Sequence, residues 1–111
     1  MKKLKIAFIT LLLSFSVHSN EIEGRVKGYI PYSASGKNIF IFSIEGQTTH
    51  NCNTTARFAI DDSNSQYMTN VSSIITALHT KEPLRVKYSN TCNSWPNSAD
   101  VKLICIGDIA C

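Results

Sequence analysis

The chain lacks the marks of a membrane-spanning protein and of a small zinc protein. No stretch approaches the roughly 18 consecutive apolar residues that a membrane-spanning helix needs, because the one apolar run near the N-terminus ends at Leu13. The four cysteines form no Cys-x-x-Cys pair, the spacing typical of structural zinc sites. The chain also has no internal repeat. We therefore expect no membrane insertion, no metal and no cofactor.

The chain also lacks a net charge outside its N-terminal segment. A basic start, the apolar run Ile6–Leu13 and the small-residue site Val17–Ser19 are typical of a secretory signal peptide. We predict a signal peptide at 1–19 and one domain at 20–111. Three of the eleven basic residues precede the predicted cut, so eight remain against eight acidic residues. A neutral domain lacks the basic surface of a nucleic-acid binder, and we expect an exported protein, periplasmic or secreted, without a nucleic-acid partner.

All four cysteines lie in the predicted mature domain, and an even number in a short exported chain indicates disulfides. Three pairings are open. We favour Cys52–Cys92, which would join two polar loops, with Cys105–Cys111, which would hold the C-terminus against the last strand. The main rival joins Cys92 to Cys105 and Cys52 to Cys111.

Hydrophobic periodicity predicts five strands and one helix. Alternating or continuous apolar residues indicate strands at 21–30, 38–44, 56–60, 84–88 and 101–106. Met68, Val71, Ile74, Ile75 and Leu78 recur at helical spacing, so the helix at 66–79 would bury this face. The polar run Asp61–Ser65 supplies candidates for the helix N-cap. We expect Gly24 and Gly28 to mark a bend or bulge in the first strand.

A helix between the third and fourth of five strands is the order of the OB-fold, a small Greek-key barrel that binds ligands with its outer face and loops. We therefore predict a mainly β, OB-fold-like barrel of five strands. Ubiquitin-like arrangements would need the helix after the second strand.

Candidate catalytic groups are few. A Cys-His nucleophilic pair needs a free thiolate, whereas the even cysteine count favours disulfides. His50 is interpreted as a solvated loop residue, and His79 as a cation at the C-terminal end of the helix. Asp61 and Asp62 could be paired carboxylates, but adjacent strand residues point to opposite faces, so helix capping explains them better. We predict that the protein is not an enzyme.

The loops that flank the ligand face of an OB-like barrel are the better candidates for function. These would be the loop at 29–37, with Tyr32, Ser33, Ser35 and Lys37, and the loop at 90–99, which holds Trp95, the only tryptophan. An aromatic ring beside hydroxyls and amides suits a sugar, whose C–H face stacks on the ring. The alternative is that Trp95 folds under its loop and closes the end of the barrel.

The chain resembles the B subunits of bacterial A–B toxins, most closely the subtilase-cytotoxin and pertussis-like B subunits. The resemblance runs from about Cys52 to Asp108. It comprises the segment Cys52–Ile60, the helix at 66–79, the segment Lys-Glu-Pro-Leu-Arg-Val-Lys at 81–87, Cys92 with Trp95, and the terminal strand at 101–106. It implies a homopentamer that binds a cell-surface glycan and delivers a separate catalytic A chain. It further implies that the segment Tyr32–Ser35 is the counterpart of a Tyr and a Ser, near the end of the first strand, that contact sialic acid.

The first hypothesis is therefore a secreted, non-catalytic glycan-binding subunit of a multimeric bacterial toxin. The second is a monomeric exported OB-like module that binds a protein partner or inhibits an enzyme. A small secreted hydrolase is a third, less favoured, possibility. Self-association and glycan binding that depends on Tyr32 or Trp95 would distinguish the first from the other two.

Overall fold

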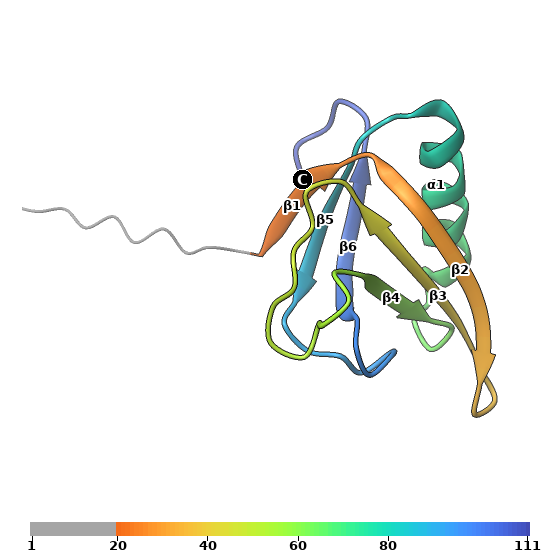
Figure 1. Ribbon diagram of the computed structural model, residues 1–111. Coiled ribbons are helices and arrows are strands. Elements are labelled where there is room, and N and C mark those ends of the chain that lie inside the picture. The colour runs from red at the N-terminus through yellow and green to blue at the C-terminus, as the bar shows by residue number, and fades with distance from the viewer. Residues whose placement is uncertain (1–19) are drawn as a thin grey trace, which may run out of the picture.

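The computed structural model describes residues 20–111, and the predicted signal peptide lies outside them. The fold is mainly β, with six strands and one helix (Figure 1). The elements are β1 (Glu21–Gly24), β2 (Val26–Ala34), β3 (Lys37–Ile44), β4 (Phe58–Asp61), α1 (Tyr67–Thr80), β5 (Leu84–Ser89) and β6 (Ala99–Ile106). The predicted helix and the positions of the strands are confirmed to within a few residues. The first predicted strand is divided in two at Arg25.

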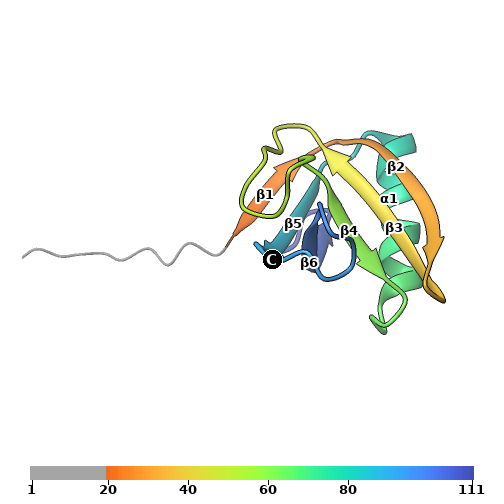
Figure 2. The same cartoon turned by 60° about the horizontal axis from the view of Figure 1, so that its bottom comes forward.

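The strands form one mixed sheet in the order β1-β5-β6-β4-β3-β2. All neighbouring pairs are antiparallel except β4 and β6, which are parallel. β1 and β2 lie at opposite ends of this order although only Arg25 separates them in the chain. The sheet curls so that one continuous stretch of chain connects its two edges (Figure 2). Within residues 20–111 no ladder joins β1 to β2, so the predicted closed barrel is not found, whereas the β-rich fold is.

Glycines permit the bend between the two edges. The position that a side chain would occupy at Gly24 is taken by the backbone carbonyl of Glu45, whose own N–H donates to the Arg25 carbonyl at 2.9 Å. A register shift between Val26 and Gly28 marks a bulge in β2. Bulges bend the strand that carries them, so the predicted roles of Gly24 and Gly28 are confirmed.

The segment 29–37 is a β-hairpin, and its prediction as a loop was wrong. β2 continues through Pro31 to Ala34, and Ser35 and Gly36 make a two-residue turn in which both have positive φ. Such a turn matches the twist of the flanking strands. Pro31 is tolerated because β2 is an edge strand, where a missing N–H breaks no central ladder.

The core lies between α1 and the inner face of the sheet. It contains Phe40, Phe42 and Ile44 of β3, together with Phe58, Ile60, Leu84 and Val86 from the strands beyond. Ile74 and Ala77 are the buried residues of the helix, and Tyr67, Val71, Ile75 and Leu78 pack around them. Met68 was predicted to lie on this face but is 70% exposed. Tyr67 takes its place, because the buried stripe passes through the first residue of the helix rather than the second.

The predicted N-cap was also wrong. The helix starts after Gln66, without a capping side chain and without an acidic residue in its first turn. Asp61 is instead the last residue of β4 and is 7% exposed. At the other end, Lys81 ends the helix in the left-handed region and Pro83 follows it, as predicted.

The two favoured disulfides are confirmed: Cys52 is bonded to Cys92 and Cys105 to Cys111. Two disulfides in so small a chain indicate an oxidising, extracellular environment. In the part of the chain that the structure describes, the helix is too short and too polar to cross a membrane.

Candidate functional site

Two of the predicted ligand-binding residues lie together on the outer face of the sheet. The rings of Tyr32 and Trp95 meet edge to face, with centroids 5.1 Å apart. Trp95 is partly buried against Ile39, Ile41 and Ala59, a small apolar cluster separate from the main core. Trp95 therefore covers part of the outer face and does not close the end of a barrel.

The loop that carries Trp95 is held in place by polar contacts. Asp100 at the start of β6 accepts hydrogen bonds from the backbone N–H groups of Asn93 and Ser94, each at 2.9 Å, and from the Thr91 hydroxyl at 2.6 Å. The Cys52–Cys92 disulfide ties the same loop to the β3–β4 connection. Trp95 is thereby presented on a braced loop.

Asp61 connects this loop to the β2–β3 hairpin. Its carboxylate accepts hydrogen bonds from Ser63 and, at 2.7 Å, from Ser94 Oγ, and lies 3.9 Å from the Lys37 ammonium. Burial on its own raises the pKa of Asp61, but the hydrogen bonds from Ser63 and Ser94 and the charge of Lys37 outweigh it. The pKa of Asp61 is therefore held below its usual value, and the carboxylate is an internal anchor.

The remaining predicted contacts are less clearly placed for a ligand. Ser33 Oγ donates to Asn38 Oδ1 at 3.2 Å, and Ser35 belongs to the hairpin turn. Lys37 is paired with Asp61. A role for Tyr32, Ser33, Ser35, Lys37 and Trp95 as ligand contacts therefore stays a prediction, in which Tyr32, 49% exposed, is the most accessible ring.

The candidate catalytic groups do not assemble. The Cys52 sulfur is bonded to Cys92 and cannot serve as a thiolate nucleophile. His79 lies in the last turn of α1, as predicted. His50 is an exposed loop residue, as predicted, but it also lines a pocket that the sequence analysis did not identify.

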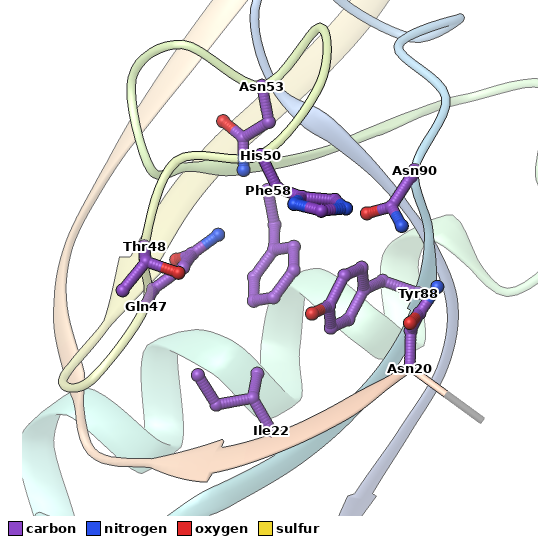
Figure 3. A pocket seen from close by; sticks show the side chains of 9 residues that line it. All are labelled: Asn20, Ile22, Gln47, Thr48, His50, Asn53, Phe58, Tyr88 and Asn90. Atoms are coloured by element: carbon purple, nitrogen blue, oxygen red, sulfur yellow. The ribbon is translucent and has the colours of Figure 1, made fainter. Parts of the chain in front are cut away.

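This pocket, here called the amide pocket, has a volume of about 190 Å³. It lies between the start of β1, the β3–β4 connection and the end of β5 (Figure 3). Phe58 and Tyr88 form an aromatic floor, with ring centroids 5.2 Å apart. The other lining residues are Asn20, Ile22, Gln47, Thr48, His50, Asn53 and Asn90. The lining contains no Asp, Glu, Lys or Arg.

The amide pocket presents a hydrogen-bond donor that the fold leaves unpaired. Gln47 Oε1 accepts a hydrogen bond from the Ile44 N–H at 3.2 Å. The amide nitrogen of the same side chain donates no hydrogen bond. Among residues 20–111, Gln47 Nε2 is the only buried side-chain nitrogen or oxygen without a hydrogen-bond partner. Asn53 is buried and accepts from the Arg57 N–H at 3.1 Å. The amide nitrogens of Gln47 and Asn53 both point into the pocket (Figure 3).

An unpaired buried donor costs free energy comparable to a lost hydrogen bond. A ligand with an oxygen acceptor would recover this free energy. The size also limits the occupant, because pockets for drug-sized ligands start near 300 Å³. The amide pocket suits one small, hydroxylated unit.

Sequence reasoning missed the amide pocket because its parts come from three separate segments. Asn53, Tyr88 and Asn90 stand in an ordinary polar loop and at a strand end. The only sequence signal for the pocket is the number of Asn and Gln residues after β3 and after β5. Such residues are common in loops, so this signal is not specific.

No family model matches the chain, and neither a curated protein nor a solved structure matches it.

Proposed function

We propose that this chain is an exported, non-catalytic subunit that binds a terminal sugar of a cell-surface glycan, and that the amide pocket holds that sugar. The observation that carries the proposal is the buried, unpaired Gln47 Nε2 above an aromatic floor. Free amide donors match the hydroxyl and carbonyl oxygens of a sugar. The partly exposed Tyr88 ring, which packs on the buried Phe58 ring, offers an apolar surface to its C–H face.

Two features of the fold support the export and the architecture. The disulfides fit an oxidising compartment, which agrees with the predicted signal peptide. The helix lies between β4 and β5, and the two edges of the sheet meet at Arg25. This arrangement supports an OB-type fold, in which the split strand β1–β2 would act as one long first strand.

The proposal includes a homopentamer that delivers a separate catalytic A chain, as the resemblance to toxin B subunits implies. A pocket of this size makes few contacts, so one site would bind weakly. Several sites on one ring would raise the overall affinity through multivalency. The alternative, a monomeric exported module with a protein partner, lacks this gain.

The test starts with the oxidised mature chain on a glycan array, followed by calorimetric titration of the glycan that binds. The informative variant is Gln47→Glu, which keeps the oxygen that accepts from Ile44 but replaces the buried donor with an acceptor. We expect it to weaken binding by about 5- to 150-fold, since a lost hydrogen bond at a buried group costs about 1–3 kcal/mol. Gln66→Glu makes the same chemical change on an exposed side chain and should leave affinity unchanged.

A blank array, or equal affinity of Gln47→Glu and the unmodified chain, would contradict the assignment of the amide pocket. Native mass spectrometry of the same sample reports the oligomer. A pentamer supports the toxin-subunit proposal, whereas a monomer at micromolar concentration favours the solitary module.

A further inference from the structure

A second hollow lies on the outer face of the sheet, beside the paired strands β2 and β3 and the start of β4. It has a volume of about 310 Å³, and its outward-facing lining residues are Gly28, Ile30, Ile41, Ser43 and Arg57. We call it the Arg57 groove. Gly28 pairs with Ser43 and Ile30 with Ile41 across the β2–β3 ladder. Directly paired residues share one face of a sheet, so these four positions are continuous on the outer face.

Arg57 supplies the only formal charge among the residues that line the groove. It is half-buried, and it directly precedes β4. Within the described part of the chain the one salt bridge joins Lys37 to Asp61, so no carboxylate there pairs with the Arg57 guanidinium. The guanidinium is therefore open to an external anion, and its planar geometry suits a carboxylate, which it can bind through two parallel hydrogen bonds.

The space beside Arg57 exists because residue 28 is glycine. A side chain at this position would meet no atom within 4 Å, and Gly28 lies next to the bulge in β2. Gly28 has no positive φ that would require a glycine. The backbone therefore tolerates a larger residue at position 28, and the absence of a side chain there leaves the groove open.

The walls of the groove are apolar. Ile30 is 43% exposed, and Ile41 forms the base. The Ser43 hydroxyl lies on the same face as Arg57 and adds a neutral hydrogen-bond donor. A ligand that matches both the charge of Arg57 and the apolar walls has one carboxylate and an apolar body.

We propose that the Arg57 groove binds an organic monocarboxylate, with its carboxylate on Arg57 and its apolar body against Ile30 and Ile41. Either a free organic acid or the C-terminal residue of a peptide presents this chemistry. The proposal is independent of the glycan function, because Arg57 and Gly28 do not line the amide pocket.

The probe is N-acetyl-L-leucine, titrated into the full mature chain and followed by NMR at the Gly28 amide and the Arg57 side chain. N-acetyl-L-leucinamide has the same shape without the charge. We expect saturable shifts at both positions with a millimolar or tighter Kd, and at least about tenfold weaker binding of the amide. The source is resolved by an acetylated tripeptide that ends in leucine: tighter binding than the free acid indicates a peptide C-terminus, and equal binding indicates a small acid.

Arg57→Gln should reduce affinity by at least about tenfold. Arg25→Gln removes the same charge from an exposed arginine at the β1–β2 junction and should change affinity by less than twofold. Gly28→Val should close the groove, and should it fail to fold, Arg57→Gln remains decisive. The proposal is overturned if acid and amide bind equally, if Arg25→Gln acts like Arg57→Gln, or if millimolar N-acetyl-L-leucine produces no saturable shift.

Discussion

The Trp95 and Tyr32 rings meet edge to face with centroids 5.1 Å apart, although the two residues come from distant segments of the chain. Their contact joins the β2–β3 hairpin to the β5–β6 loop on the outer face of the sheet. Asp61 joins the same two segments through its ion pair with Lys37 and its hydrogen bond from Ser94. Together these contacts define a braced surface that is separate from the amide pocket, which allows the two candidate sites to be tested separately.

Trp95→Ala should lower the free energy of unfolding by about 2–3 kcal/mol while leaving glycan affinity within twofold. The protein loses stability because Ile39, Ile41 and Ala59 become exposed. The loss is smaller than the roughly 3–5 kcal/mol for replacing a fully buried tryptophan by alanine, because Trp95 is only partly buried. Urea unfolding and calorimetric titration measure the two effects. Trp95→Phe, which keeps most of the cover, is the control. A folded Trp95→Ala protein that no longer binds the glycan would move the sugar site to the Tyr32–Trp95 surface.

Removing the Cys52–Cys92 disulfide by double substitution to serine should cost about 4 kcal/mol, and removing Cys105–Cys111 about 2 kcal/mol. The difference reflects the loops that they close, since their sequence separations are 40 and 6 residues and loop-closure entropy grows with length. Urea unfolding of both double variants checks the order. Equal losses would show that strain or residual structure, rather than loop length, decides the contribution.

Asp61→Asn should destabilise the protein at neutral pH by about 1–3 kcal/mol, since a charged acceptor of two hydroxyl hydrogen bonds is lost. The pKa of Asp61 is lower in the folded protein than in the unfolded chain. Its stabilising contribution is therefore complete above the unfolded value, near 4, and is lost as the pH falls through the folded value. The difference in the free energy of unfolding between Asp61→Asn and the unmodified protein should therefore shrink below pH 4.

Chemical unfolding at a series of pH values from 2 to 7 provides the measurement. Asp62→Asn is the matched control, because the neighbouring Asp62 is exposed and the amide oxygen of asparagine can still accept the hydrogen bond from the Asn38 N–H. A difference between Asp61→Asn and the unmodified protein that is independent of pH would contradict the anchoring role of the carboxylate.

Gly24→Ala should destabilise the protein by at least about 1–3 kcal/mol, the usual cost of overpacking. The added methyl would meet the backbone carbonyl of Glu45, which cannot move without breaking the β1–β2 bend. Gly28→Ala meets no atom within 4 Å and should change stability by less than about 1 kcal/mol. Thermal unfolding of the two variants compares them directly. A neutral Gly24→Ala would show that the bend can open.

Local patterns predicted most of the elements because each depends on neighbouring residues. A continuous apolar run located β3, alternation located β5, helical spacing located α1, and Pro83 marked the end of the helix. The same reasoning was wrong where a residue's role depends on a distant partner. Pro31 is compatible with a strand only because β2 is an edge, and Asp61 binds Ser94 instead of capping the helix.

The sequence by itself determined the order of strands and helix and an even set of cysteines, and it predicts a signal peptide followed by one neutral domain. These follow from composition and from periodicities that any short segment carries. Only the tertiary structure decided that the sheet stays open between β1 and β2, that Tyr32 meets Trp95, and that the Gln47 amide lies unpaired above Phe58 and Tyr88. The reason is that strand pairing brings together side chains from distant segments. A pocket forms only between such segments, and a donor becomes unsatisfied only when they bury it away from water.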